Sequence, residues 1–220
     1  MDLAITIADW VFFLSIIAAF IVSIIHREKK DLRPIQLYIV VSIVLNATLK
    51  IIEAFSSTNK NIETAIINIF STLEITILYY YLVKRITRMK FQISMLIFLA
   101  TYFLACIILW TVKEEGVFFY SPNLFGVEGF LLTIPCLFYV LEILNSDTYF
   151  DLKANEHFIV SCGILFYFSI TIPSYFGWYN LYYSDPTFYK LVIISNYIFY
   201  TVFFITIIKA YLCTTIKPLP

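Results

Sequence analysis

Seven apolar stretches, each about as long as a membrane-spanning helix, occupy most of this 220-residue chain. A helix rises about 1.5 Å per residue, so roughly 20 apolar residues cross the hydrocarbon core of a bilayer. The sequence therefore predicts an all-α integral membrane bundle, formed as a single domain over residues 1–220 with short connections. The predicted transmembrane helices are Leu3–Ile25, Ile35–Phe55, Ile62–Val83, Phe91–Val112, Leu124–Leu144, Phe158–Phe176 and Phe188–Tyr211.

Composition supports a membrane protein and argues against a nucleic-acid-binding one. Hydrophobic residues make up 61% of the chain and the mean hydropathy is +0.86, whereas soluble domains are about half apolar. The 15 Lys and Arg residues balance the 15 Asp and Glu residues, so the chain lacks the basic field on which nucleic-acid binding depends. The partner that this composition predicts is the lipid bilayer.

Positive charges alternate between the connections and predict the orientation of the bundle. Eleven Lys and Arg residues fall on one side of the predicted helices, eight of them in the connections HREKKDLRP and KRITRMK, and four fall on the other side. By the positive-inside rule we expect the N-terminus outside and the C-terminus in the cytoplasm. Because Met1-Asp2 supplies no basic n-region, we expect Leu3–Ile25 to remain as a helix and not to be cleaved as a signal peptide.

Polar side chains within the predicted helices mark a candidate site. Glu74 lies 13 residues beyond Asn61, which places it about 20 Å below the outer end of its helix, beyond the membrane midplane. A charge in hydrocarbon costs at least about 2.5 kcal/mol, so such residues usually face the bundle interior and mark function. Asn68 and Ser71 precede Glu74 within one broad sector of the same helix.

A second polar stripe lies in the predicted helix Ile35–Phe55. Asn46, Lys50 and Glu53 follow at i, i+4 and i+7, on one face and in the outer half of the membrane. Lys50 either extends its ammonium to the outer interface or pairs with Glu74 or Glu53, since consecutive antiparallel helices usually touch. The sequence leaves both alternatives open.

Together these residues predict a polar pocket that opens to the outside and ends near Glu74. Asp9, Glu128, Lys190 and Asn196 add polar groups on the outer side of other helices, and we expect Glu128 to lie near the mouth, largely solvated. The alternative is a polar core in which every group is paired and no ligand binds. The candidate ligand-binding residues are Asn46, Lys50, Glu53, Asn68, Glu74, Glu128 and Asn196.

The sequence lacks the residues that several kinds of catalytic or cofactor site require. The centre of the last predicted helix, NYIFYTVFFI, has no lysine for a retinal Schiff base. His26 and His157 are the two histidines and both fall at the predicted cytoplasmic boundary, so the ligands of a zinc hydrolase are missing. GxSxG and phosphate-binding glycine motifs are absent. We therefore predict no metal and no cofactor, and we expect the four scattered cysteines to be small buried apolar side chains.

Three of the predicted helices carry recognisable patterns. A Glu precedes a Tyr-rich run in NIFSTLEITILYYYLVKR, a Glu lies in VEGFLLTIPCLFYVLEIL, and HFIVSCGILFYFSITIPSYF contains Gly-Ile-Leu-Phe-Tyr-Phe-Ser. In these patterns, and over most of the chain from Asn46 onward, the chain resembles a family of small, uncharacterised bacterial seven-helix membrane proteins. The resemblance implies a bacterial inner membrane and an association with two-component signalling proteins, and it implies no catalytic role. The positions that it marks are Glu74, Tyr80, Glu128, Gly163, Tyr167 and Ser169.

Three classes of function remain. A ligand-sensing or signal-relaying module fits the outer pocket and the basic cytoplasmic connections, and it would act through a cytoplasmic or membrane signalling protein. A small transporter or channel usually has paired helix breaks in two halves, whereas Pro135 and Pro173 both fall in the later half. An intramembrane lipid-modifying enzyme would use Glu74 with Glu128 or Lys50 as acid and base. We expect the sensing module and keep the other two as alternatives.

Overall fold

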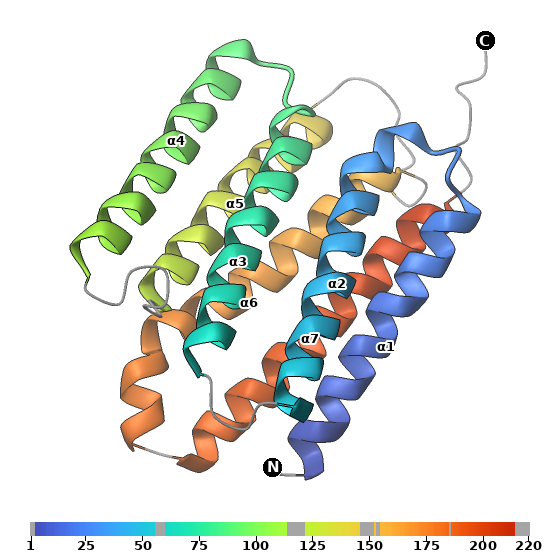
Figure 1. The fold of residues 1–220 in the computed structure, drawn as a ribbon. Coiled ribbons are helices and arrows are strands. Elements are labelled where there is room, and N and C mark those ends of the chain that lie inside the picture. Colours follow the sequence, from blue (N-terminus) through green and yellow to red (C-terminus); the bar gives the residue numbers. More distant parts are fainter. Residues whose placement is uncertain are drawn as a thin grey trace.

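The computed structural model describes residues 3–55, 60–113, 122–145, 152, 155–184 and 186–213, and in this part of the chain every regular element is a helix (Figure 1). Seven of the helices are long and apolar enough to cross a membrane, which confirms the predicted all-helical fold. In chain order the elements are α1 (Leu3–Ile25), η1 (Lys30–Leu32), α2 (Arg33–Phe55), α3 (Lys60–Val83), α4 (Met89–Val112), α5 (Pro122–Leu144), α6 (Glu156–Ser184) and α7 (Pro186–Leu212).

The helix boundaries agree with the sequence to within about two residues except at the end of α6. We expected a connection from Gly177 to Thr187, but α6 continues to Ser184 and α7 begins at Pro186. The prediction ended the helix where the apolar run ends, although a helix need not stop at the membrane surface. Pro186 suits the first turn of α7 because that position needs no backbone N–H donor. The side chains of the aromatic run from 178 to 183 lie outside the described part.

Three helices form the centre of the bundle. Buried residues make up 56% of the apolar span in α3, 44% in α5 and 50% in α6, against 17% in α1, α4 and α7. α6 packs between α5 and α7, α1 packs against α7 and α2, and α3 packs against α2 and α5. α4 stands at the edge of the bundle beside α5 (Figure 1). A side chain on the inner face of α3 is therefore surrounded by neighbouring helices.

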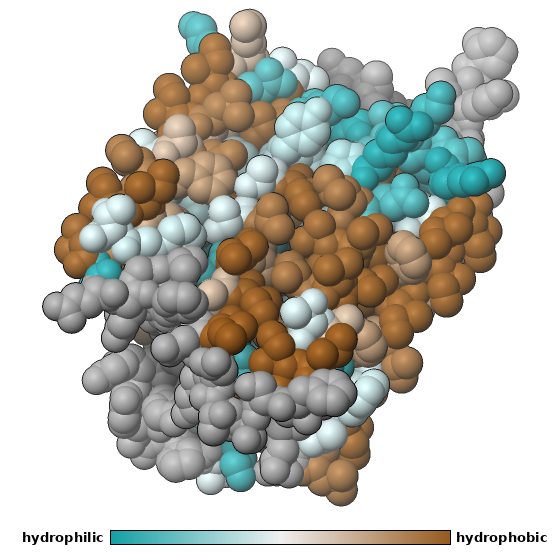
Figure 2. Space-filling view, viewed as in Figure 1, coloured by the Kyte–Doolittle hydropathy of each residue, from teal (hydrophilic) through white to brown (hydrophobic). Residues whose placement is uncertain are grey.

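Apolar side chains cover the outside of the bundle. Leu96, Ile107, Val44 and Ile198 are among many large hydrophobic residues that are more than half exposed. Figure 2 shows apolar surface along the described sides and hydrophilic residues gathered at the end that holds the connection between α1 and α2. A soluble monomer rarely exposes apolar patches of this extent, whereas the hydrocarbon core of a bilayer solvates them.

Glycines allow the central helices to approach closely, although the sequence contains no GxxxG pair. A Cβ on Gly163 of α6 would lie 2.1 Å from Thr206 Oγ1 of α7. In α5, a Cβ on Gly129 would lie 2.6 Å from Ile172 of α6. These two positions hold α6 against both of its neighbours, which places the aromatic residues of α6 and α7 in contact.

Candidate functional site

Glu74 projects from α3 into the centre of the bundle, where it is 7% exposed. Its Oε1 accepts hydrogen bonds from the hydroxyls of Tyr38 in α2, at 2.8 Å, and Tyr200 in α7, at 2.5 Å. The two tyrosine hydroxyl oxygens lie 2.7 Å apart. Buried polar groups need such partners because water is not available to them. The cluster of Tyr38, Glu74 and Tyr200, called here the Glu74 cluster, therefore joins three helices through one carboxyl group.

Stacked aromatic rings fix the position of Tyr200. Its ring lies 4.9 Å from the ring of Phe12 in α1 and 4.3 Å from that of Tyr167 in α6, at interplanar angles of 11° and 9°. Tyr38 is supported by Phe204 of α7, with centroids 5.9 Å apart. Ring pairs at these separations add stability beyond the area that they bury. Tyr200 is thus held between α1 and α6 while its hydroxyl reaches α3.

A cavity of about 210 Å³ lies beside the Glu74 cluster. Its walls come from the first half of α1 and α3, the second half of α2 and the middle of α6 and α7, so it extends from the centre of the bundle toward the end at which α1 begins (Figure 1). Tyr200 lines the cavity and donates its hydroxyl hydrogen to Glu74. The other lining residues are Phe12, Leu45, Asn46, Leu49, Ile67, Phe70, Tyr167, Tyr175, Asn196 and Tyr197.

Two of the candidate ligand-binding residues line this cavity. Asn46 donates its Nδ2 hydrogen to the carbonyl oxygen of Ser42 at 2.8 Å. Asn196 forms no hydrogen bond with any other residue that the structure describes. Asn68 is buried in α3, at 6% exposure, but does not line the cavity. The side chain of Glu53 lies outside the described part of the chain.

Lys50 does not pair with Glu74, so that predicted interaction is wrong. Its ammonium forms an ion pair with Asp9 of α1, and it lies 4.8 Å and 5.4 Å from the ring centroids of Trp10 and Phe13. Lys50 is in the second half of α2, where α1 offers a carboxylate and two rings at the same level. Glu74 lies deeper, where tyrosine hydroxyls satisfy it.

Glu128 belongs to a second polar cluster, close enough to Glu74 for the two carboxyl groups to interact electrostatically, and it is not solvated as we expected. At 2% exposure it is more buried than Glu74. Ser71 of α3 donates a hydrogen bond to its Oε2, and its Oε1 has no hydrogen-bond partner among the described residues. Tyr102 and Cys106 of α4, both buried, lie close enough to interact electrostatically with Glu128. The prediction failed because α4 covers this face of α5.

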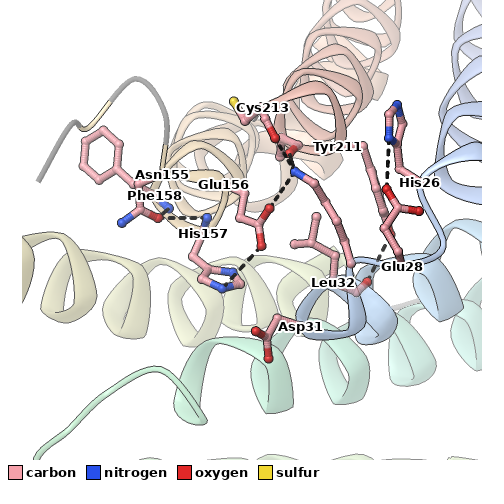
Figure 3. Close-up of polar contacts among 12 residues, drawn as sticks. His26, Glu28, Asp31, Leu32, Asn155, Glu156, His157, Phe158, Tyr211 and Cys213 are labelled. Atoms are coloured by element: carbon pink, nitrogen blue, oxygen red, sulfur yellow. Dashed lines mark hydrogen bonds and ion pairs between the residues drawn. The ribbon is translucent and has the colours of Figure 1, made fainter. Parts of the chain in front are cut away.

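Charged side chains form a second network at the opposite end of the bundle. Lys29 pairs with Glu156 at 2.7 Å and donates hydrogen bonds to the carbonyl oxygens of Ala210, at 3.1 Å, and Cys213, at 2.5 Å. Figure 3 shows Glu156 and His157, at the start of α6, facing the end of α7 and the connection before α2. A cation at the C-terminus of α7 interacts favourably with its unpaired carbonyls. Lys29 thus ties the connection between α1 and α2 to both α6 and α7.

Local sequence places the start of α6 in this network. Asn155 accepts hydrogen bonds from the backbone N–H groups of His157 and Phe158, each at 3.0 Å (Figure 3), as an N-cap residue does. The His157 ring then reaches the hydroxyl of Tyr81 in α3 at 2.9 Å. The cap therefore directs Glu156 toward Lys29 and His157 toward α3.

Sequence reasoning missed Tyr38 and Tyr200 as functional residues. The chain has 17 tyrosines, and tyrosines in membrane proteins commonly lie at the membrane interface or pack against other rings. The position of Tyr200 along its helix could have identified it. Tyr200 lies near the middle of α7, whereas a tyrosine at the membrane interface lies near a helix end. A mid-membrane hydroxyl needs a buried partner, and Glu74 was the deepest acceptor in the predicted helices.

Comparison of the sequence with protein-family models and with curated proteins, and of the fold with solved structures, found no match. The geometry of the cavity and of the two polar networks is therefore the basis for proposing a function.

Proposed function

We propose that the protein is a ligand-sensing module of a bacterial inner membrane, in which a small molecule enters the cavity from outside and changes the hydrogen bonding of Glu74. One observation carries this proposal: Tyr200 both lines the cavity and donates to Glu74. A ligand that moves the Tyr200 ring alters contacts with α1, α3 and α6 together. Binding that favours one arrangement of these contacts shifts the population of the whole bundle.

The orientation in this proposal has the cavity facing outward and the Lys29 network in the cytoplasm. The excess of Lys and Arg on the Lys29 side supports it. Single-cysteine labelling in intact cells should therefore find positions 29 and 88 protected from an impermeant thiol reagent and positions 60 and 115 accessible. The reverse pattern would turn the cavity toward the cytoplasm and contradict outward sensing.

α7 provides the route from the cavity to the cytoplasmic side. Tyr200 and Ala210 lie ten residues apart on this helix, a rise of about 15 Å. The carbonyl oxygens of Ala210 and Cys213 accept hydrogen bonds from Lys29, so a displacement of α7 strains that network. In this proposal the output passes to a cytoplasmic or membrane signalling protein that contacts the basic connections at that end.

Packing below the cavity favours sensing over transport. Tyr38, Phe203 and Phe204 are completely buried, and Tyr38 stacks on Phe204. A transport path would require these side chains to separate, whereas a sensor needs a closed floor that responds to the ligand. The transporter alternative would be supported by substrate uptake that Tyr38→Ala increases.

Filling the cavity tests the proposal without a known ligand. Leu49→Trp places extra volume in the cavity, and Leu37→Trp, at a residue of the same helix that is 54% exposed, is the matched control. In a protein whose other three cysteines are alanine, we expect Leu49→Trp to change the rate of Cys213 alkylation at least threefold and Leu37→Trp to leave it unchanged. Equal rates in both variants would contradict coupling between the two ends.

A further inference from the structure

The cavity presents a hydrogen-bond acceptor at Asn46. The Nδ2 group of Asn46 donates to the Ser42 carbonyl oxygen, which only accepts. This bond fixes the amide orientation and leaves Oδ1 without a partner in the described part of the chain. The amide of Asn196, also on the cavity wall, has no hydrogen bond to described residues. Asn46 Oδ1 is therefore free to accept a hydrogen bond from a ligand N–H group, and the Asn196 amide can donate to the ligand or accept from it.

The surroundings of the cavity favour a positive ligand. The residues that line it carry no formal charge. Lys50, one turn from Asn46 on α2, is neutralised by Asp9 and directed onto the rings of Trp10 and Phe13. The nearby ammonium is thus already paired and directed away from the cavity, while the rings of Tyr167, Tyr197 and Tyr200 on the cavity wall attract a cation.

The size and the walls of the cavity limit the body of the ligand. Its volume is about 210 Å³, and a cavity of about 150 Å³ holds benzene. The space therefore takes one six-membered ring with about three further non-hydrogen atoms, or an aliphatic chain of similar volume. Leu45, Leu49, Ile67 and Phe70 supply apolar walls, and tyrosine rings attract cations as well as apolar groups.

We infer that the ligand sensed by this cavity is a small primary amine in its ammonium form, with a compact aromatic or aliphatic body. The inference rests on the proposed sensing function and adds the chemical class of the ligand. The ammonium group donates to Asn46 Oδ1, the aromatic rings of the wall hold its positive charge, and the apolar body occupies the space between α2, α3 and α7.

Three probes of similar shape and different charge test this inference. The purified full-length protein in lipid nanodiscs is titrated at pH 7 with 2-phenylethylammonium, 2-phenylethanol and phenylacetate, and binding is followed by calorimetry. We expect the ammonium ion to bind at least tenfold more tightly than the alcohol, with phenylacetate the weakest. Equal or tighter binding of the alcohol or of phenylacetate would overturn the amine assignment and leave the cavity as a ligand site. Failure of all three probes to bind would overturn both the assignment and the proposed function.

Variants at Asn46 separate the acceptor from the shape of the cavity. Asn46→Asp keeps the side-chain volume and adds negative charge, although it gives up the hydrogen bond to the Ser42 carbonyl oxygen, and we expect it to tighten ammonium binding at least fivefold. Asn46→Leu should weaken ammonium binding at least tenfold and change alcohol binding less than threefold. Thr48→Val, at an exposed residue of the same helix, is the control and should leave both affinities unchanged. If Asn46→Asp weakens ammonium binding in a folded protein, the assignment of Asn46 as the acceptor is wrong.

Discussion

Glu74 and Glu128 are both buried carboxyl groups, at 7% and 2% exposure, but their surroundings differ. Glu74 accepts two tyrosine hydroxyls from two other helices, and one of those tyrosines lines a cavity. Glu128 accepts one serine hydroxyl, and its other oxygen has no partner in the described part of the molecule. Depth of burial therefore does not rank the two groups. The number of helices that each one joins, and its contact with the cavity, separate a functional candidate from a local polar contact.

The largest expected difference is in stability on removing each carboxyl group. Glu74→Leu leaves the hydroxyls of Tyr38 and Tyr200 without their acceptor and should cost about 3 kcal/mol of the free energy of unfolding. Glu128→Leu should cost less than about 1 kcal/mol, because it also removes an unpartnered oxygen and Ser71 can bond to its own helix. Reversible unfolding of the detergent-solubilised protein measures both. Equal losses would remove the distinction between the two carboxyl groups.

The next largest expected effect concerns Lys50, and it tests whether this cation contributes to the stability of the Glu74 cluster. Removal of either Lys50 or Asp9 should cost about 2 kcal/mol because the remaining charge loses its partner. In double-mutant cycles, Lys50→Met with Asp9→Asn should therefore show a coupling energy of at least about 1 kcal/mol, whereas Lys50→Met with Glu74→Gln should be additive. An equally large coupling energy between Lys50 and Glu74 would show that these two residues interact, as the sequence had predicted.

Removing single hydroxyls should separate stability from ligand response. Tyr38→Phe and Tyr200→Phe each delete one hydrogen bond to Glu74, at a cost of about 1 kcal/mol of the free energy of unfolding. Only Tyr200 lines the cavity, so Tyr200→Phe should abolish the effect of Leu49→Trp on Cys213 alkylation and Tyr38→Phe should retain at least half of it. Identical responses from the two variants would show that the cavity does not act through Tyr200.

The smallest expected effect on stability is the loss of the hydrogen bond between Ser71 and Glu128. Ser71→Ala removes the hydrogen bond to Glu128 Oε2 and should lower the free energy of unfolding by only about 0.6 kcal/mol, the average for hydrogen bonds within membranes. Ammonium binding should be unchanged. A loss above about 2 kcal/mol in the same unfolding assay would show that the Glu128 cluster holds α3 and α5 together as strongly as the Glu74 cluster holds its helices.

Most of the fold follows from the sequence because each helix must be apolar over a fixed length. The prediction over Leu3–Ile25 matches α1, and the later helices begin about two residues before the predicted starts. The end of α6 differed because hydrophobicity reports where the membrane ends and not where the hydrogen-bonded helix ends. The orientation of the bundle stays a prediction from its charges.

The sequence predicted which helices carry the candidate site, but it did not predict which residues contact one another there. Asn46 and Asn196 line one cavity, as their similar level in the predicted helices indicated. Lys50 turned toward α1, and Glu128 was covered by α4, because pairing depends on which helices are neighbours and sequence order alone does not supply that. Tyr38 and Tyr200 were missed since a tyrosine carries no charge that marks it in an apolar helix.

Infrared difference spectroscopy tests most directly the central claim that filling the cavity changes the hydrogen bonding of Glu74. Spectra of the protein in lipid, with and without whichever of the three probes binds, record the carboxyl and tyrosine bands on the same sample. The account predicts a carboxyl difference band that is absent in Glu74→Gln, retained in Glu128→Gln and shifted in Tyr200→Phe. A difference spectrum that is identical in wild type and Glu74→Gln would contradict the claim, because the ligand would then fill the cavity without reaching the carboxyl group behind it.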